Sequence, residues 1–311
     1  MHKTLLLGAI SSFTLASAAL AEVPAVAVDI PPIHSLVSIV MEGVGTPDLI
    51  MQAGASPHGY SLRPSEAAAL QRADVIFWVS ESLTPWLEGP IEALAGDAKS
   101  VELLEAEGTT ELEFREGVTF EEHDDGDEDD EQEHEEDHDH HGHDPHAWLD
   151  PENARIWLDV IANELSAIDP EHAATYVANA SAGKAELNSL IGEINTQLES
   201  FHSTNFVVFH DAYQYFENRF DILAAGSITL GDGSDPSPAR IAEIRNKVAD
   251  LNVRCAFAEP QFNPGLVNTV FRGTNAKTGI LDPVGSDLEL GPDLYSQLLR
   301  NMADSLAACL E

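Results

Sequence analysis

The stretch "PEHAATYVANASAGKAELNSLIGEINTQLESF", from Pro170 to Phe201, decides how the chain is organised. It begins with a proline, which is favoured in the first turn of a helix. Its apolar residues recur at intervals of three and four, the spacing of one helix face: Leu187, Leu190, Ile191, Ile194, Leu198 and Phe201. A helix of about thirty residues would be ~45 Å long, enough to run the length of two domains. We therefore expect one long, rigid helix over residues 169–202 that joins two lobes.

An α/β lobe is expected before this helix, over residues 22–168. Four short segments have the composition of buried strands: Ala25–Ile30, Asp48–Gln52, Asp74–Ser80 and Ser100–Glu105. Helical patterns lie between them, as in "SLVSIVMEGV" (35–44) and "PSEAAALQRA" (64–73), and another helix follows the capping residue Asp150. The alternation of strand and helix is typical of a parallel sheet.

The same alternation returns after the linking helix, over residues 203–311. Three strands are expected in "NFVVFH" (205–210), "VRCAFAEP" (253–260) and "GILDPVG" (279–285). Helical patterns lie between them, and a terminal helix is expected from Pro292. The predicted fold class is therefore α/β, with two lobes of parallel-type sheet joined by one long helix.

The N-terminus has the pattern of a secretory signal. His2 and Lys3 precede an apolar run from Leu5 to Leu20, and Ala19-Leu20-Ala21 is an A-x-A cleavage pattern. We therefore expect residues 1–21 to be removed, and the mature protein to work in an exported compartment, most simply a periplasm.

Charge and cysteine content restrict the partners and the redox chemistry. The formal net charge of −39 argues against nucleic acid and anionic membrane as partners, and we expect a monomer. The chain has only two cysteines, Cys255 and Cys309. An oxidising compartment would favour a disulfide between them, and two separately buried thiols are the alternative.

An insert from Glu121 to Asp144 interrupts the first lobe. It holds fifteen acidic residues and no Lys or Arg, with six histidines: His123, His134, His138, His140, His141 and His143. Such a segment cannot bury enough surface to offset the entropy of ordering it, so we expect disorder. Its histidines are expected to bind zinc weakly, with fast exchange and sensitivity to pH; a solvated charge run without a metal role is the alternative.

Four polar residues stand at expected strand ends or just after turns, where open α/β sheets place their ligands. They are His58, His146, His210 and Asp282, two from each lobe. Three imidazoles and one carboxylate form a suitable tetrahedral set for Zn²⁺ in a cleft between the lobes. The alternative is that each is an ordinary hydrogen-bonded residue, and spacing alone does not decide.

Five stretches resemble the ZnuA family of periplasmic zinc-binding receptors of ABC importers. They are "GASPHGYSLRPSEAAALQRADVIFWVS", "HDPHAWLDPENAR", "FVVFHDAYQYFENRF", "CAFAEPQFNPGLV" and "GILDPVGSDLELG". The resemblance covers nearly the whole mature chain in the same order, and the family also carries a His- and acid-rich insert before its second ligand. It implies that His58, His146 and His210 bind zinc and that Cys255 and Cys309 form a structural disulfide. It also implies Zn²⁺ as the cargo and an ABC permease of the inner membrane as the partner.

The chain departs from the family pattern at one position. Several zinc-binding members carry a Glu ligand immediately before the first histidine, where this chain has Pro57. The fourth ligand should therefore be Asp282, as in manganese-binding relatives, or a water. Those relatives tend to have a Glu where this chain has His210, and a third nitrogen shifts preference from Mn²⁺ toward Zn²⁺. A manganese receptor remains the alternative within the family.

Other polar residues have secondary roles in this interpretation. Asp144 is expected to orient His146 rather than to bind metal, and Glu259 is expected near the cleft. For His34, a capping or core role is favoured over one in the cleft, while His172 and His202, which flank the long helix, are expected to be solvated.

Three functions compete at this point. The first is a receptor that captures Zn²⁺ and delivers it to a permease. The second is a secreted zinc hydrolase, which needs an open water position and a general base; the sequence has no complete H-x-H-x-D-H motif, because Pro145 stands where that motif needs an aspartate. The third is a metal buffer that acts through the insert, and buffering would survive loss of His58 and His210. We favour the receptor, and the rigid linking helix predicts only a small closure on metal binding.

Overall fold

The computed structural model describes residues 23–115, 142–229, 253–262 and 276–311, with scattered positions between 239 and 274. The expected signal segment and the insert histidines His123, His134, His138, His140 and His141 lie outside the described residues. Within the described part of the chain, no helix is both long enough and apolar enough to cross a membrane.

The N-terminal lobe is built on a four-stranded parallel sheet in the order β2-β1-β3-β4. Its strands are β1 (Val26–Val28), β2 (Asp48–Leu49), β3 (Val75–Trp78) and β4 (Lys99–Glu102). Every residue of β1 and β3 is buried, which explains their continuous apolar sequences. The helices that connect the strands are α1 (Pro31–Val40), α2 (Pro64–Arg72) and α3 (Glu88–Leu94). Both α1 and α2 begin with proline, as a helix start favours.

The C-terminal lobe contains a three-stranded parallel sheet in the order β5-β6-β7. Its strands are β5 (Phe206–Val207), β6 (Cys255–Ala258) and β7 (Lys277–Ile280), and α6 (Gln214–Phe220) follows β5. The disulfide implied by the resemblance is present: Cys255 of β6 is bonded to Cys309, near the end of the chain. It ties the C-terminal helix to the middle strand of this sheet.

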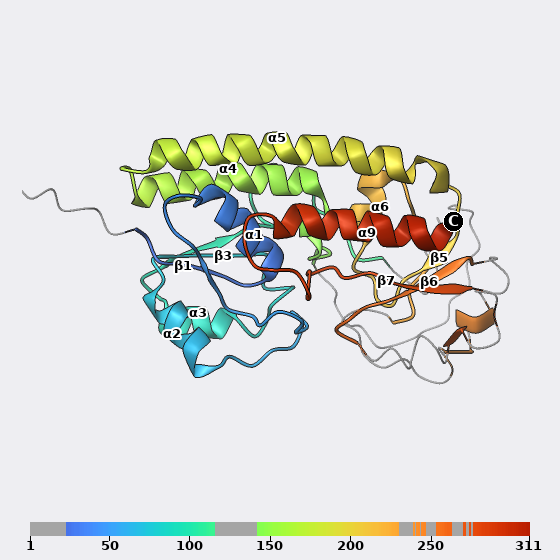
Figure 1. The fold of residues 1–311 in the computed structure, drawn as a ribbon. Helices are drawn as coiled ribbons and strands as arrows, with labels where there is room; N and C mark the ends of the chain where they lie inside the picture. The colour runs from blue at the N-terminus through green and yellow to red at the C-terminus, as the bar shows by residue number, and fades with distance from the viewer. Residues whose placement is uncertain are drawn as a thin grey trace, which may run out of the picture.

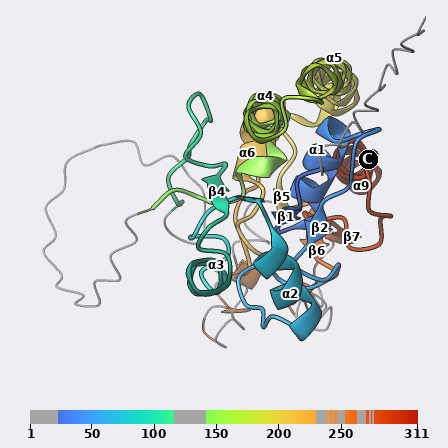
Figure 2. The same ribbon diagram turned by 90° about the vertical axis from the view of Figure 1, so that its left-hand side faces the viewer.

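Three long helices form a layer over the two sheets. They are α4 (Pro151–Ile168), α5 (Ala173–Leu198) and α9 (Leu294–Leu310). In Figure 1, α5 extends above both lobes, and Figure 2 looks nearly along α4 and α5, which lie side by side. The expected linking helix is therefore confirmed, with 26 residues and a closing 3₁₀ turn, η2 (Glu199–Phe201). It is not the only connection, because α9 returns from the second lobe and packs on both α5 and α1.

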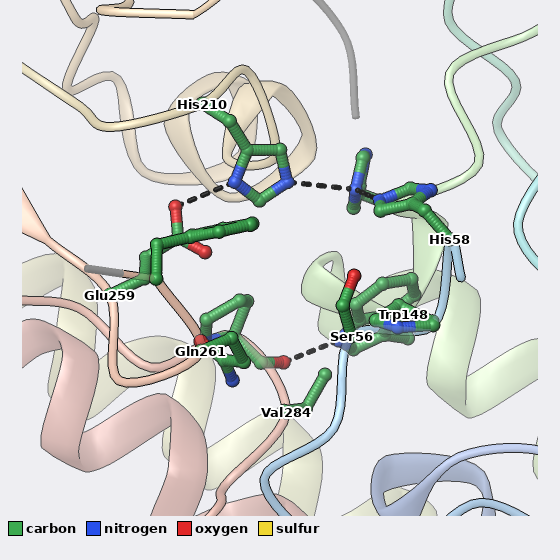
Figure 3. Close-up of a pocket in the computed structure, with 11 residues that line it drawn as sticks. Ser56, His58, Trp148, His210, Glu259, Gln261 and Val284 are labelled. Atoms are coloured by element: carbon green, nitrogen blue, oxygen red, sulfur yellow. Dashed lines mark hydrogen bonds and ion pairs between the residues drawn. The ribbon is translucent and has the colours of Figure 1, made fainter. Parts of the chain in front are cut away.

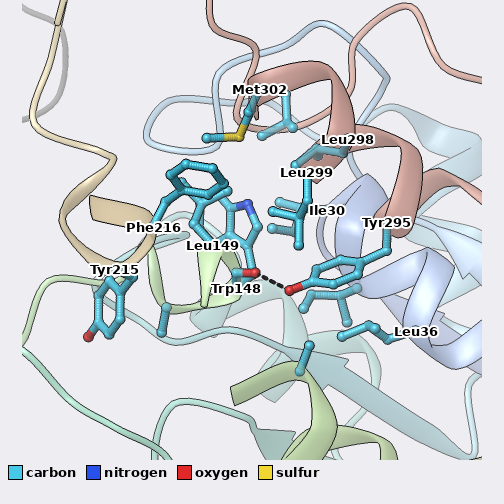
Figure 4. Packing of buried hydrophobic residues seen from close by; sticks show 14 of the residues in the cluster. Ile30, Leu36, Trp148, Leu149, Tyr215, Phe216, Tyr295, Leu298, Leu299 and Met302 are labelled. Atoms are coloured by element: carbon cyan, nitrogen blue, oxygen red, sulfur yellow. Dashed lines mark hydrogen bonds between the residues drawn. The ribbon is translucent and has the colours of Figure 1, made fainter. Parts of the chain in front are cut away.

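The main hydrophobic core is continuous between the lobes. Figure 4 shows residues of α1, α6 and α9 packed around Trp148, and one buried cluster includes residues of both sheets. Two hydrogen bonds cross this core: Trp148 Nε1 donates to Pro283 O at 2.7 Å, and Tyr295 Oη donates to Trp148 O at 2.7 Å. At its edge, Ser35 Oγ donates to Pro292 O at 2.9 Å. The lobes are thus packed together as well as connected.

Candidate metal centre

His58 lies in the loop between β2 and α2, and Glu66 of α2 holds that loop in place. The buried Glu66 carboxylate accepts hydrogen bonds from Gln52 Nε2 and Tyr60 Oη, each at 2.8 Å. It also accepts one from the backbone N–H of Arg63 at 2.7 Å, which closes a capping box at the start of α2. The loop is therefore anchored on both sides of His58.

His146 is held by the short 3₁₀ turn η1 (Ala147–Leu149), which it precedes. This turn leads directly into α4, whose first N–H groups are capped by the Asp150 side chain. Trp148 in the turn is fully buried and bonded to the other lobe, as described above. The backbone that carries His146 is therefore fixed to both lobes.

His210 follows β5 at the carboxyl edge of the second sheet. Phe209, the residue before it, stacks on Phe262 with ring centroids 4.7 Å apart, and the same Phe262 ring lies edge-on to His210 at 5.4 Å. His210 is only 4 % exposed. Apolar packing therefore sets where this imidazole lies.

The three imidazoles meet at one point between the lobes (Figure 3). His146 Nε2 lies 3.3 Å from His58 Nε2 and 3.4 Å from His210 Nε2, and one ligand atom from each ring falls within 4.8 Å of the others. With Zn–N bonds of roughly 2.0–2.1 Å, the ligand nitrogens of a tetrahedral site lie roughly 3.3–3.4 Å apart. The two measured separations match that edge length. The cavity they line measures about 10 Å³, the space of one small occupant.

A carboxylate stands behind each of the two buried imidazoles. Asp144 Oδ1 accepts a hydrogen bond from His146 Nδ1 at 2.7 Å, and Glu259 Oε1 accepts one from His210 Nδ1 at 2.6 Å. Such a bond leaves Nε2 as the metal-binding atom and fixes the plane of the ring. The expected positions of Asp144 beside His146 and of Glu259 near the cleft are both confirmed by these contacts.

Burial and charge act differently on the two imidazoles. Burial lowers the pKa of His146 well below its usual value, with a further contribution from the charge of His210, so this ring is neutral and ready to bind a metal. Burial also disfavours a charge on His210, but the charge and hydrogen bond of Glu259 outweigh it and raise the pKa of this ring. A metal at His210 therefore competes with a proton.

A buried ion cluster supports the residues next to His210. Arg115 donates to Asp211 Oδ2 from Nε at 3.0 Å and to Glu217 Oε2 from Nη1 at 2.7 Å. Tyr215 Oη donates to Asp144 O at 2.8 Å and accepts from the backbone N–H of Leu112 at 2.9 Å. Both ends of the chain around the insert are thus attached to α6, and Arg115 is also attached to the side chain of Asp211, next to His210.

Asp282 is not part of the cluster that the three histidines form among the described residues. Its Oδ2 accepts a hydrogen bond from Ser286 N at 2.6 Å, and its Oδ1 accepts from Val284 N at 3.2 Å and from Gly285 N at 3.0 Å. Gly285 has a φ of 72°, which favours glycine. The carboxylate therefore holds a tight turn after β7, and its role as the fourth ligand stays a prediction.

The remaining histidines lie away from the cluster. His143 was expected in the insert, but it pairs with Glu113 in a β-bridge and its Nδ1 lies 2.8 Å from Glu111 Oε2, so it belongs to the folded base of the insert. His34 is buried within α1, as expected for a core residue. His172 is bonded to Asp169 at 2.7 Å beside the start of α5, and His202 is partly exposed.

Three residues that the sequence reasoning did not single out bear on the site: Glu66, Arg115 and Gln261. The signal for Gln261 was present, because it follows β6 just after Glu259, at the same sheet edge as His210. Gln261 lines the cavity with the histidines. Arg115 gave no local signal, because its partners are about a hundred residues away in sequence.

Comparison with known proteins assigns the family. The model described as "Zinc-uptake complex component A periplasmic" matches residues 26–309. The high-affinity zinc uptake system protein ZnuA of Brucella abortus (strain 2308) is 49 % identical, over 100 % of this chain and 98 % of its own length. The corresponding protein of Paracoccus denitrificans is 43 % identical, over 96 % of this chain and 95 % of its own.

Solved structures agree on the fold. A zinc-bound ZnuA deletion mutant has a TM-score of 0.76 at 24 % identity, and covers 93 % of this chain and 99 % of its own. The laminin-binding adhesin Lmb of Streptococcus agalactiae has a TM-score of 0.74 at 25 % identity, with 93 % and 100 % covered. With its family model matched almost end to end and close relatives aligned over their full length, the chain belongs to the ZnuA family.

Proposed function

We propose that this protein is a periplasmic receptor that captures Zn²⁺ with His58, His146 and His210 for uptake into the cell. The observation that carries the proposal is the meeting of three imidazole nitrogens at tetrahedral spacing. Relatives over the full length of the chain are named high-affinity zinc uptake proteins, which supports the same cargo. The ion is transported, so it is the substrate of this protein.

The donor set favours zinc over manganese as cargo. Three imidazoles suit Zn²⁺, whereas Mn²⁺ prefers carboxylate, carbonyl and water oxygens. The carboxylates of Asp144 and Glu259 are each bonded to a histidine Nδ1. They orient ligands, and this arrangement favours a binding site over a hydrolytic one, which would need a carboxylate free to act as general base.

The partner that fits this role is the membrane permease of an ABC importer, which would receive the ion from the receptor. The signal pattern at residues 1–21 supports export to the periplasm before that encounter. We expect a monomer to carry one tightly bound ion to the permease. The insert histidines would add weaker, faster-exchanging zinc sites beside the principal one.

The test is a competition titration with a chromophoric chelator on the mature protein, with and without residues 121–141. One tight zinc site should persist in the truncated protein, together with a preference for Zn²⁺ over Mn²⁺. His58→Ala, His146→Ala and His210→Ala should each abolish tight binding. His202→Ala, a partly exposed histidine outside the cluster, serves as the matched control. Tight binding that survives all three site substitutions would rule out the proposed receptor site.

A further inference from the structure

Gln261, in the wall of the metal cavity, has a buried side-chain oxygen. Gln261 lines the cavity with the three histidines, and Figure 3 shows it near Glu259, across the cavity from His58. Its Oε1 is buried, and among the described residues it has no hydrogen-bond partner. A buried acceptor without a donor costs stability, unless a ligand or a bound water supplies the donor.

The orientation of this amide is determined by its neighbours. Gln261 Nε2 donates to Asp282 Oδ1 at 3.1 Å and to Ser286 Oγ at 3.0 Å. Exchanging the two ends of the amide would set its carbonyl oxygen against a carboxylate oxygen, which is repulsive. Asp282 is itself fixed by the backbone N–H groups of the turn after β7. The turn therefore binds the N–H₂ group of Gln261, and Oε1 remains available to accept a hydrogen bond.

A zinc ion held by three imidazoles needs one more ligand to complete a tetrahedron. Asp282 does not join the three histidines, and Pro57 cannot serve. A water on the zinc would carry polarised O–H groups that require an acceptor, and Gln261, a cavity-lining residue, has an amide oxygen without a donor among the described residues.

We propose that Gln261 is a positioning residue that accepts a hydrogen bond from the water completing the zinc coordination, and that Asp282 acts on the metal only through Gln261. This inference rests on the proposed function, because it assumes zinc at His58, His146 and His210. It gives Asp282 a role behind the amide instead of a direct bond to the metal.

The test measures zinc affinity by competition titration on the mature protein without residues 121–141. Gln261→Leu removes the acceptor and should weaken zinc binding about tenfold. Gln261→Glu keeps an acceptor oxygen but sets a second one against Asp282, so it should retain tight binding only when it is combined with Asp282→Asn, which restores a donor to this contact. Gln197→Leu, which breaks a similar side-chain bond to the exposed Asp304 on α9, is the matched control and should bind as the wild type does. If the leucine variant does not fold, Gln261→Met replaces it at the same side-chain length.

A double-mutant cycle tests the relay. If Asp282 acts only through Gln261, Asp282→Ala weakens binding alone but adds nothing in the Gln261→Leu background. The visible spectrum of the Co²⁺-loaded protein should change in Gln261→Leu, because its coordination water loses its acceptor, and not in Gln197→Leu.

Three results would overturn the inference: unchanged affinity and Co²⁺ spectrum in Gln261→Leu, equal weakening by Gln261→Leu and by Gln261→Glu combined with Asp282→Asn, or fully additive losses in the double mutant of Gln261→Leu and Asp282→Ala. His58→Ala separates this failure from that of the proposed function. If His58→Ala loses tight binding while Gln261→Leu does not, the receptor stands and only the role of Gln261 falls.

Discussion

At the scale of single residues, His210 shows how the fold prepares an imidazole for a metal. Phe262 lies edge-on to the buried ring, and the carboxylate of Glu259 is bonded to Nδ1, while Nε2 faces His146. The hydrogen bond to Glu259 fixes the tautomer and raises the basicity of the ligand nitrogen. Both partners are almost fully buried, so their mutual interaction is strong.

Removing Glu259 should therefore weaken the metal site without touching a metal ligand. We expect Glu259→Ala to lower zinc affinity about 10- to 100-fold, the usual effect of losing a carboxylate behind a metal-binding histidine. Glu259→Gln retains an acceptor oxygen and should cost less. Competition titration measures both variants. Zinc affinities indistinguishable from wild type would show that packing alone orients His210.

Asp29 provides a prediction about pH at the end of β1. Burial raises the pKa of this carboxyl to about 7, against the lowering effect of hydrogen bonds from the backbone N–H groups of Val79 and Ile30. Between roughly pH 4 and 7 the folded protein keeps a proton that the unfolded chain has released, so the free energy of unfolding falls as pH rises.

Asp29→Asn removes this titration. The stability advantage of the wild type over the variant should shrink as pH rises from about 4 to 7, because only the wild type loses stability through the carboxyl. Urea unfolding of both proteins across that range measures the difference. A constant difference at every pH would contradict the raised pKa of Asp29.

The positions of the three histidines could be predicted from the sequence because each stands at the end of a strand or just after a turn, next to recognisable motifs. The turn that Asp282 holds could not be predicted. The sequence "GILDPVG" suggested a strand through that residue, but β7 ends at Ile280, since the Asp282 carboxylate binds the N–H groups of the following turn. Competition between side-chain and ladder hydrogen bonds depends on tertiary geometry, which periodicity does not reveal.

At the scale of elements, the linking helix was the most predictable feature, because a long amphipathic pattern has few alternative structures. What the sequence did not reveal is how closely α5 packs. Gly183 lies where α1 and α4 approach it, and a Cβ there would lie 2.9 Å from Ile39 Cγ2 and 3.0 Å from Leu158 Cδ1. A Cβ added at Gly192, in the same helix, would meet no atom within 4 Å.

These two glycines form a matched pair. Replacing a glycine inside a helix by alanine normally stabilises by roughly 0.5–1 kcal/mol, and we expect that gain for Gly192→Ala. Gly183→Ala should lose the gain or destabilise, because the new methyl group displaces neighbours in α1 and α4. Thermal and urea unfolding of the two variants provide the comparison. Equal stabilisation at both positions would show that α5 is loosely packed at Gly183.

At the scale of the whole molecule, the two lobes are connected in several ways that resist movement. α5 extends over both, α9 returns from the second lobe onto α1, and the core is continuous around Trp148 and Tyr295. The residues that carry His146 are bonded to the second lobe through Pro283. Large closure would break these contacts together, so any motion on metal binding should be small.

Small-angle scattering of the mature protein without residues 121–141 checks this expectation. We expect zinc loading to leave the radius of gyration nearly unchanged, while Trp148→Phe, which removes the hydrogen bond to Pro283, should permit more change. Strong compaction of the wild type on zinc binding would mean that the connecting helices act as a hinge.

The central claim is that three imidazoles and one further ligand hold the zinc, and X-ray absorption at the zinc edge tests it most directly. The sample is the mature protein without residues 121–141, loaded with less than one equivalent of zinc so that only the tight site is occupied. The account predicts a four-coordinate shell with three imidazoles at roughly 2.0–2.1 Å and one oxygen. A shell with fewer than three imidazoles, or a six-coordinate shell dominated by oxygen, would contradict it.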